Sequence, residues 1–494
     1  MREMSSRRYL SKTKIMAGHQ CPKRLWLDVH APEKAEVSEA TERDFRMGHD
    51  VGRIAQTLWP DGILIGHDRE LGEALRETAE HLEGEKPVTL FEGTVSANGV
   101  LIRADVLTRD DNGEVRLVEV KASTSVKPQY IDDCAIQAWV LEQSGLVLTS
   151  VQLAHVNNQF VYAGNGDYNG LLELADVSER VRERVDEIPN FVSGLRTMLA
   201  EQEPSITVGR HCHQPYDCPF LSYCTPPQPS YPVTALPGGR GVHEPLLADG
   251  IESILDVPAG QLTNKKAEWA RAVTVAGEPE LRPEAAIELK RLGWPRYYFD
   301  FETVSFAVPI WAGTRPYQAL PFQWSCHVEY EDGSKAHHEF LADADADAPP
   351  MRDCAEGLIK VLGEEGPILV YTSYEQGVLQ NLAGRFPDLA PRLKVVMERL
   401  YDLHPVTRAN YYHPDMMGSW SLKKVLAAVA PELAHSRLDG CVKDGGAASR
   451  AFLELLDPDL PAERHKYLRQ SLLEYCKRDT FGLVRLAHFL GSAR

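Results

Sequence analysis

The sequence lacks long apolar runs. None of its 494 residues belongs to a stretch near the roughly 20 apolar residues that span a bilayer. Residues 1–8 are basic but lack the apolar core of a signal peptide. We therefore expect a cytoplasmic protein without a membrane partner. The sequence also has no internal repeat and no long low-complexity tract.

Positive charge is scarce as well: 53 Lys and Arg stand against 71 Asp and Glu, for a net charge of −18. This balance argues against a protein that coats nucleic acid through a basic surface. It does not exclude a nuclease, because carboxylates that hold divalent cations add to the negative count. A hydrophobic content of 43% and a charged content of 25% are typical of a globular protein, and the length predicts two or three domains.

The nine cysteines are poor disulfide candidates in the cytoplasm, and we interpret them as metal ligands or core residues. The candidate metal ligands are one early cysteine and three late, evenly spaced ones: Cys21, Cys212, Cys218 and Cys224. They could hold zinc together with His211 or His213, or they could simply be buried. The other five show no ligand spacing and are expected to be core or surface thiols: Cys134, Cys326, Cys354, Cys441 and Cys476.

Proline and glycine mark one clear break in the chain. Residues 225–241 hold five prolines and three glycines, a density that disfavours helices and central strands. Helix-like patterning follows up to residue 292, and a new α/β pattern begins at Pro295. The sequence therefore predicts an α/β protein in three parts: a domain over residues 1–228, a linker with a helical connector over 229–292, and a domain over 293–494.

A first acidic signature lies on a predicted antiparallel meander within residues 89–121, whose first two strands meet at a tight hairpin, Asn98-Gly99. Alternation along the third strand puts Glu119 and Lys121 on one face. The neighbouring strand can bring Asp105 opposite them. Two carboxylates and an ammonium group suit phosphodiester hydrolysis, because carboxylates bind Mg²⁺ or Mn²⁺ and lysine stabilises developing charge.

A second acidic signature is divided between two distant segments. Asp300 and Glu302 alternate to one face of an aromatic-rich strand. Near the C-terminus, Tyr475 and Asp479 lie one turn apart on a predicted helix. Acids from such segments can hold two divalent ions about 4 Å apart. Tyr475 would then orient or deprotonate the attacking water, although its unperturbed pKa of about 10 makes it a poor base without metals.

Two aromatic residues follow the first acids of this second signature. Trp311 and Tyr317 could stack on bases, as aromatic side chains do in sites for single-stranded nucleic acid. They could equally pack within a loop. The sequence leaves both interpretations open.

The first signature resembles a known motif. Residues 103–105 (Arg-Ala-Asp) and 118–123 (Val-Glu-Val-Lys-Ala-Ser) are similar to the core of the PD-(D/E)XK superfamily in its RecB-like branch. A glutamine on the following helix, predicted from Pro128, also matches that branch. The resemblance implies a restriction-endonuclease-like fold with these site residues: Asp105, Glu119, Lys121 and Gln137.

The match departs from the pattern at one metal ligand. Many RecB-like nucleases carry a histidine four residues after a glycine on an early helix, but here Gly48 is followed at that spacing by Gly52. His49 is the candidate substitute. The cysteines resemble the set that closes CRISPR-associated RecB-like and AddB-type nucleases, and this resemblance implies a [4Fe–4S] cluster on Cys21, Cys212, Cys218 and Cys224.

The second signature resembles the DEDD exonucleases of the DnaQ-like, ribonuclease H-like fold, in the subclass with tyrosine in the third motif. The resemblance implies that Asp300, Glu302 and Asp479 bind Mg²⁺ or Mn²⁺ and that Tyr475 is catalytic. Glu375, after the strand-like segment 368–371, takes the place of the family's middle acid. Asp402 is the second candidate for that place, and Lys423 in an "sLK"-like segment is a candidate phosphate contact.

The whole arrangement resembles an uncharacterised family in which a RecB-like domain is fused to a DEDD-type domain. It predicts a metal-dependent nuclease, with single-stranded DNA as the favoured substrate, that acts in DNA processing or defence. One alternative is that only the DEDD domain is catalytic, on DNA or RNA, while the first domain binds nucleic acid. The other is a non-catalytic adaptor that the cysteine site holds together.

Overall fold

The structure is a computed structural model that describes residues 9–36, 39–66, 68–84, 86–343, 345, 348–433, 438 and 440–494, without the side chains of residues 39–44. The N-terminal residues 1–8, on which the signal-peptide expectation depends, lie outside this set. Within it, no helix combines the length and apolarity needed to cross a membrane.

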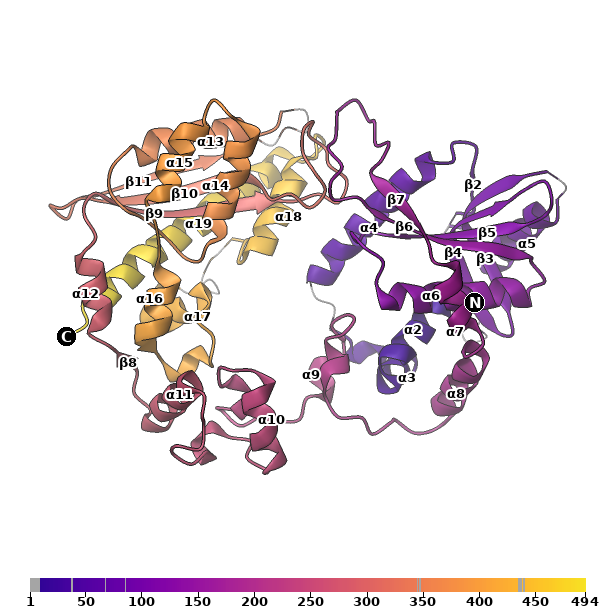
Figure 1. The fold of residues 1–494 in the computed structure, drawn as a ribbon, viewed down its shortest axis with the longest axis horizontal. Helices are drawn as coiled ribbons and strands as arrows, with labels where there is room; N and C mark the ends of the chain where they lie inside the picture. Colours follow the sequence, from indigo (N-terminus) through magenta and orange to yellow (C-terminus); the bar gives the residue numbers. More distant parts are fainter. Residues whose placement is uncertain are drawn as a thin grey trace. The chain divides into compact units, whose positions relative to one another are not determined.

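The chain forms two compact units, and both are mixed α/β (Figure 1), as the sequence predicts at this level. The first unit consists of Met1–Pro226 together with Phe306–Tyr317. The second consists of Pro227–Ser305 together with Gln318–Arg494. The division thus falls within the proline-rich stretch, and neither unit is one continuous segment of the chain.

A seven-stranded sheet forms the centre of the first unit. Its order is β2-β3-β4-β5-β6-β7, with β1 pairing along β4. β3, β4 and β5 are antiparallel neighbours, whereas β5 and β6 are parallel and are connected through helix α6. The strands are β1 (Leu10–Ser11), β2 (Ile63–Leu64), β3 (Val88–Ala97), β4 (Val100–Arg109), β5 (Val115–Lys121), β6 (Leu148–Val156) and β7 (Leu172–Asp176).

The helices of the first unit cover both faces of this sheet. The largest apolar core lies on the face covered by α2, α5, α6, α7 and α8, while the α4 side has smaller clusters. The helices are α2 (Lys12–Gln20), α3 (Pro22–His30), α4 (Glu39–Thr57), α5 (Leu71–Glu83), α6 (Pro128–Gln143), α7 (Ser178–Val185), α8 (Ile188–Ala200) and α9 (Leu221–Cys224).

The predicted meander is confirmed by strands β3, β4 and β5. Asn98 and Gly99 join the first two strands with φ angles of 49° and 71°, as a two-residue hairpin with left-handed central residues requires. Leu117 packs in the core on the α6 side, whereas Val118 packs on the α4 side. The alternation therefore turns Glu119 and Lys121 toward α6.

The segment Phe306–Tyr317 is packed within the first unit although both of its neighbours in the sequence belong to the second. The backbone of Tyr162 exchanges two hydrogen bonds with this segment, at Gly313 and Thr314. Trp311 is only 2% exposed and packs edge-on against Phe306. The structure therefore supports loop packing for Trp311 and contradicts base stacking, because the ring is not accessible to a ligand.

Tyr317 is also engaged by the protein in this segment. Its φ of 58° is left-handed, and its amide donates to the carbonyl of Phe306 at 2.8 Å. The side chain packs against the cluster of Val51, Val156 and Leu171. It is a packing residue of the first unit rather than a free stacking surface.

The second unit is built on a five-stranded sheet of order β11-β10-β9-β12-β13. β9, β12 and β13 run parallel, and β10 and β11 complete the other edge as antiparallel strands. The strands are β9 (Arg296–Val304), β10 (Leu320–Glu329), β11 (Lys335–Leu341), β12 (Ile368–Val370) and β13 (Leu400–Asp402), and the short strands β8 (Glu280–Leu281) and β14 (Tyr411–Tyr412) form a separate pair.

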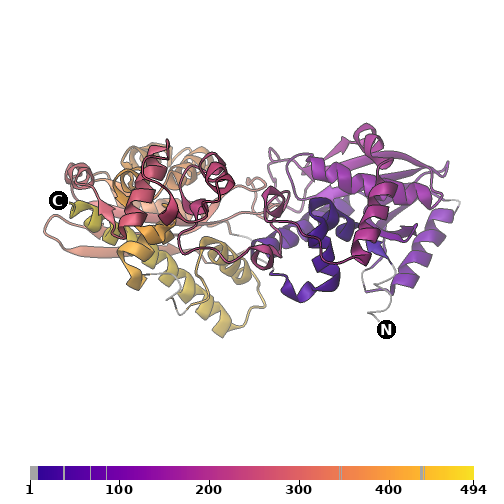
Figure 2. The ribbon, with the colours of Figure 1, turned by 90° about the horizontal axis from the view of Figure 1, so that it is seen from below.

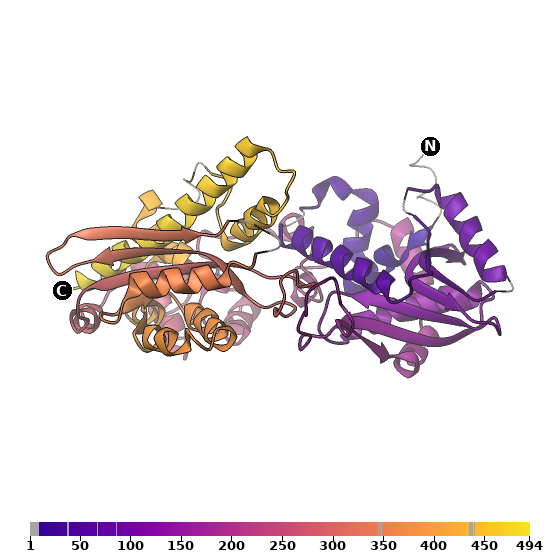
Figure 3. The ribbon, with the colours of Figure 1, turned by 90° about the horizontal axis from the view of Figure 1, so that it is seen from above.

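The long C-terminal helix α19 lies on one face of this sheet and contacts β9 and β10, while α13 packs on the other face of β10 (Figure 3). The helices after the first strand are α13 (Met351–Leu362), α14 (Tyr374–Arg385), α15 (Ala390–Glu398), α16 (Leu403–Asn410), α17 (Leu422–Val429), α18 (Gly445–Leu455) and α19 (Ala462–Gly491). The sequence-predicted helix around residues 472–480 is the middle of α19.

The predicted helical connector is helical, but it is not a separate body. It contains α10 (Arg240–Ala248), α11 (Lys265–Ala276) and α12 (Glu284–Lys290), which pack against the rest of the second unit (Figure 2). Leu246 and Leu289 belong to the same apolar core as residues of β9, β12 and α19. Val233 is fully buried there too, so the proline-rich stretch is part of the core rather than a free linker.

Candidate functional sites

In the first unit, the predicted residues Asp105, Glu119, Lys121 and Gln137 come together where β4, β5 and α6 meet. Pairing of β4 with β5 ends at Val106 and Val118. Two residues further along β5, the amide of Val120 donates to Asp105 Oδ2 at 2.6 Å. Asp105 thus takes the place of a strand carbonyl. Its carboxylate separates the two strands beside Glu119.

Glu119 is 1% exposed and is bound from two sides. Lys121 Nζ donates to its Oε1 at 2.6 Å, and Gln137 Nε2 donates to its Oε2 at 2.6 Å. Gln137 also donates to Asp133 Oδ1 at 3.0 Å, and Lys121 donates to Asp133 Oδ2 at 2.7 Å. Asp133 therefore belongs to the same buried network.

Two members of this network are absent from the sequence-based site. Asp133 lies four residues before Gln137 on α6, so the helical spacing that places two residues on one face could have indicated it. Lys12, at the start of α2, lies 2.9 Å from Glu119 Oε1 and 3.0 Å from Asp133 Oδ1. No local pattern in the sequence connects Lys12 to β5.

The charges of the network act strongly on one another. Burial, followed by the charge of Glu119, raises the pKa of Asp105 to about 7. Burial alone would raise the pKa of Asp133, but Lys12 and Lys121 hold it well below its usual value. For both lysines, the neighbouring carboxylates outweigh burial and raise the pKa. Two lysines thus neutralise two acids, and Asp105 is the acid left over.

His49 does not complete this cluster. It is exposed on α4, and no hydrogen bond or ion pair joins it to Asp105 or Glu119 within the described part of the chain. A Cβ built on Gly52 would meet no atom within 4 Å. The position at which many RecB-like nucleases carry a histidine therefore faces open space here.

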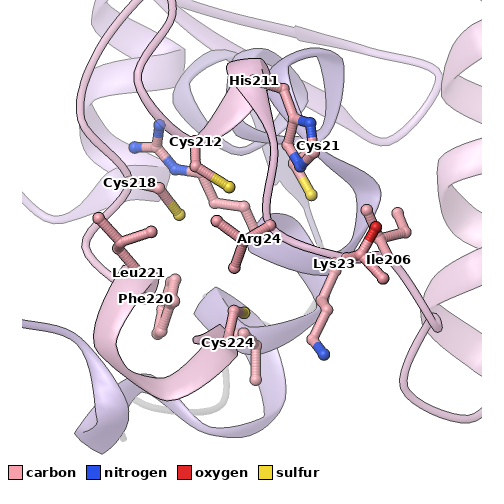
Figure 4. A pocket seen from close by; sticks show the side chains of 13 residues that line it. Cys21, Lys23, Arg24, Ile206, His211, Cys212, Cys218, Phe220, Leu221 and Cys224 are labelled. Atoms are coloured by element: carbon pink, nitrogen blue, oxygen red, sulfur yellow. The ribbon is translucent and has the colours of Figure 1, made fainter. Parts of the chain in front are cut away.

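The four cysteines singled out in the sequence line one pocket of the first unit (Figure 4). Cys21 lies between α2 and α3, and the other three come from the segment that includes α9. Burial raises the pKa of the Cys218 and Cys224 thiols. Arg24 and His211 also line the pocket.

These thiols share one pocket, but no three of them are packed tightly together. Among the described residues, no three of these four cysteines have sulfur atoms that all lie within 4.8 Å of one another. His213 is exposed and pairs with Asp217 at 2.9 Å instead of joining the pocket. Of the two histidines considered as zinc ligands, only His211 lies beside the thiols.

In the second unit, three distant segments bring the second acidic signature together. Asp300 and Glu302 lie on β9, Glu375 lies in the first turn of α14, and Tyr475 and Asp479 lie on α19. Glu302, Glu375, Tyr475 and Asp479 are all buried, with exposed fractions of 7% or less. Within the described part of the chain, no lysine or arginine forms an ion pair with Asp300, Glu302 or Glu375.

Crowded carboxylates raise one another's pKa at this site. Burial, then the charge of Asp479, raises the pKa of Asp300 to about 7. Burial and the charge of Asp300 raise the pKa of Glu302 and of Glu375 well above the usual value. Burial, then Asp479, raises that of the Tyr475 hydroxyl. Such a cluster is costly when ionised and gains most from a bound cation.

The two candidates for the middle acid have different roles. Asp402 caps α16 by accepting from the amide of His404 at 2.8 Å, and it also accepts from the amide of Thr372 at 2.8 Å. Glu375 is 2% exposed, and its Oε2 has no hydrogen-bond partner. The structure therefore places Glu375 in the acid cluster and gives Asp402 a structural role beside it.

Polar contacts fix α19 against the strand that lies next to β9. Gln323 Nε2, on β10, donates to the carbonyl of Leu472 at 2.8 Å. Ser325 Oγ lies 2.8 Å from Thr480 Oγ1, directly after Asp479. Because these contacts flank Tyr475 and Asp479, they hold both side chains over the acids of β9.

Three further side chains surround these acids. Tyr374 is 46% exposed, and its hydroxyl hydrogen-bonds that of Thr303, next to Glu302. Lys423 is exposed, and its charge lowers the pKa of Glu302 against the larger effect of burial. Asp444 caps α18 through the amide of Ala447 at 2.8 Å and raises the pKa of Glu302. Tyr374, directly before Glu375, and Asp444 are absent from the sequence-based site.

Comparisons with known proteins give little beyond a partial family match. Residues 297–421 match the family model described as "Domain of unknown function (DUF2779)". The match includes β9 and Glu375 but ends before Tyr475 and Asp479. No curated protein matches the chain.

Among solved structures, one titled "Crystal structure of SSO0001" is 15% identical in sequence. The alignment covers 44% of this chain and 86% of that one, with a TM-score of 0.22. A TM-score of this size supports no statement about fold. Neither comparison names an activity. The two acidic sites and the cysteine pocket are therefore the features that bear on function.

Proposed function

We propose that the chain is a divalent-metal-dependent nuclease that hydrolyses phosphodiester bonds, with single-stranded DNA as the favoured substrate. One observation carries this proposal: Asp300, Glu302, Glu375 and Asp479 converge from three elements of the second unit, and among the described residues no lysine or arginine forms an ion pair with Asp300, Glu302 or Glu375. Burial of several carboxylates together costs free energy of desolvation, which a bound cation would offset. Oxygen donors are also the ligands that Mg²⁺ and Mn²⁺ prefer. These acids would hold the ions.

The strand order of the second unit supports a ribonuclease H-like, DnaQ-type fold for this domain. Its central strand β9 carries the first two acids, and the antiparallel pair β10-β11 lies on one side with parallel strands on the other. In the first unit, the Glu-x-Lys pair at the end of β5 and the α6 crossover to β6 support a PD-(D/E)XK fold.

Bound divalent cations would acidify the attacking water and stabilise the leaving oxygen. The protein's own side chains would position the substrate. Tyr475, whose raised pKa keeps its hydroxyl protonated, would donate a hydrogen bond to the attacking water or to a phosphate oxygen. Tyr374 offers an exposed ring for stacking on a terminal base, and Lys423 offers an ammonium group to the backbone phosphate.

The first unit supports a second cutting site less directly. Asp105, Glu119, Lys121 and Gln137 have the expected arrangement, but Lys12 already occupies one oxygen of Glu119. A metal ligated by Asp105 and Glu119 would have to displace that ammonium group. This ion pair favours the second candidate function, in which only the DEDD-type unit cuts and the first unit binds nucleic acid.

The cysteine pocket fits an iron–sulfur cluster better than zinc. Four thiolates around a single zinc ion lie about 3.8 Å apart, from a Zn–S distance of about 2.3 Å. The four sulfur atoms here lie farther apart than that. A [4Fe–4S] cluster is larger than a single ion and is held by four thiolates that lie farther apart.

Digestion of end-labelled single-stranded DNA and RNA with Mg²⁺ or Mn²⁺ tests the nuclease proposal. Asp300→Asn should lower the rate by at least about 100-fold, while Asp353→Asn, an exposed acid on α13, should not. Comparison with Glu119→Gln then decides whether the first unit also cuts. A wild-type protein inactive on all four combinations of substrate and metal would overturn the proposal and leave the adaptor alternative.

The cluster proposal has its own test. Anaerobically purified protein should be brown, and Cys218→Ser should lose the visible absorption, whereas Cys354→Ser, a buried thiol of the second unit, should keep it. A colourless protein that contains zinc would reverse the assignment.

A further inference from the structure

Cys476 lies at the second acidic site, although its sequence spacing suggested an ordinary core thiol. It follows Tyr475 on α19 and stands three residues before Asp479, so the two side chains share a helix face. Its sulfur and one oxygen each of Asp300 and Glu302 all lie within 4.8 Å of one another. The thiol is fully buried and lies 3.9 Å from the backbone oxygen of Asp300.

A second observation shows spare ligand capacity at the same place. Glu375 is 2% exposed and lies beside Asp300, and its Oε2 has no hydrogen-bond partner. A buried carboxylate oxygen without a donor is costly and accepts a cation readily. The site therefore holds one soft donor and several hard donors around a common point, with one hard donor unsatisfied.

The Cys476 thiol adds a donor that Mg²⁺ does not use. Magnesium and manganese prefer oxygen ligands, whereas a thiolate favours Zn²⁺ and similar soft ions, such as Cd²⁺. Zinc also binds a given site more tightly than Mn²⁺ does in the general order of divalent metals. A site with two carboxylates and one thiolate provides three of the four ligands of a tetrahedral zinc ion.

We propose that Asp300, Glu302 and Cys476 form a binding site for zinc or another thiophilic divalent ion, which competes with the oxygen-ligated ions of the same acids. Binding would release the thiol proton to solvent and occupy both carboxylates of β9. Zinc would thus inhibit the chemistry of this site. The inhibition rests on the proposed nuclease function, whereas the binding does not.

Cobalt(II) titration tests the binding directly, because Co²⁺ takes zinc ligand sets and a thiolate ligand gives a strong near-ultraviolet absorption. The wild-type protein should develop this absorption, and Zn²⁺ should remove it. Cys476→Ser should lack that part of the signal, while the cysteines of the first unit contribute equally to both proteins and cancel in the difference. Cys354→Ser, which changes another fully buried thiol of the same unit, should keep the signal.

Folding of each variant is checked by thermal unfolding, and Cys476→Ala serves if the serine variant does not fold. Glu302→Gln should weaken the Cys476-dependent Co²⁺ signal by roughly tenfold or more in affinity. Identical Co²⁺ spectra of wild type and a folded Cys476 variant would overturn the site.

Activity separates the two proposals. If the wild-type protein degrades nucleic acid, the Zn²⁺ concentration for half-inhibition should rise roughly tenfold or more in Cys476→Ser. Equal inhibition of both proteins would overturn the competition. If the protein shows the Cys476-dependent Co²⁺ signal but degrades nothing, the nuclease proposal fails and the metal site stands.

Discussion

Lys12 Nζ lies 2.9 Å from Glu119 Oε1, although 107 residues separate the two in the sequence. The same ammonium group lies 3.0 Å from Asp133, so one residue of α2 connects the strand and the helix that carry the first site. The charge of the buried Glu119 is thereby balanced by a lysine that lies outside the Glu-x-Lys motif of β5.

Lys12→Met should destabilise the first unit, because Glu119 and Asp133 would then share only Lys121 as a cation. Removal of one partner from a buried ion pair costs roughly 3 kcal/mol in the free energy of unfolding. Denaturant unfolding at pH 7 measures this loss. Lys86→Met, which changes an exposed lysine of the same unit, is the matched control; equal losses in both variants would show that Lys12 has no special role.

Asp105→Asn should stabilise the metal-free protein at alkaline pH. The pKa of Asp105 is about 7 in the folded protein, against about 3.9 in an unfolded chain. The folded state therefore binds more protons between these values, and the free energy of unfolding falls as the pH rises from about 4 to 7.

The asparagine variant should lose this pH dependence and gain up to about 4 kcal/mol at pH 8, with little difference near pH 4. Unfolding in chelator at both pH values measures the change. Asp111→Asn, in the exposed turn after β4, is the control and should match wild type. A wild-type stability that does not fall across this range would contradict the buried, acid-paired state of Asp105.

Tyr475→Phe should lower kcat without changing the pH dependence of the reaction. Burial, then Asp479 and Glu302, raises the pKa of the hydroxyl, so it donates a hydrogen bond and does not act as the base. Loss of that donor should reduce kcat by roughly 10- to 100-fold. Tyr467→Phe, on the exposed side of the same helix, is the control; an alkaline limb of the profile that disappears with Tyr475 would assign it as the base.

Tyr374→Ala should raise KM for single-stranded substrates, because the exposed ring is the part that a base can stack on. Stacking contributes about 1–3 kcal/mol per base, which corresponds to a rise of roughly 5- to 160-fold. Tyr374→Phe keeps the ring and should keep KM near the wild-type value. Tyr330→Ala, at the distant end of β10, controls for loss of an exposed tyrosine.

Local patterns in the sequence were sufficient for the meander and for the segments that carry the second acidic signature. The meander of β3 to β5 could be predicted because strand alternation and the Asn98-Gly99 turn are local signals. The acids of β9 and the Tyr475–Asp479 pair could be found for the same reason. Whether these segments form nuclease folds stays a prediction, since the family match and the structural comparison name no activity.

Contacts between distant segments could not be predicted in the same way. Lys12 reaches Glu119 only because α2 packs against β4 and α6, which no short motif encodes. The sequence left base stacking and loop packing open for Trp311, and its enclosure by tertiary packing could not be predicted from it. Cys476 has no ligand spacing along the sequence, and its position near Asp300 appears only when α19 lies across β9.

The placement of Phe306–Tyr317 in the first unit has a practical consequence for dissecting the protein. The chain passes from one unit to the other three times, after residues 226, 305 and 317. A gene cut at the proline-rich stretch would therefore leave the N-terminal product without the piece that covers Val51 and Leu171. The C-terminal product would carry that apolar piece with nothing to pack against. Separate halves should be made with this segment grafted to the N-terminal half and replaced by a short polar loop in the other.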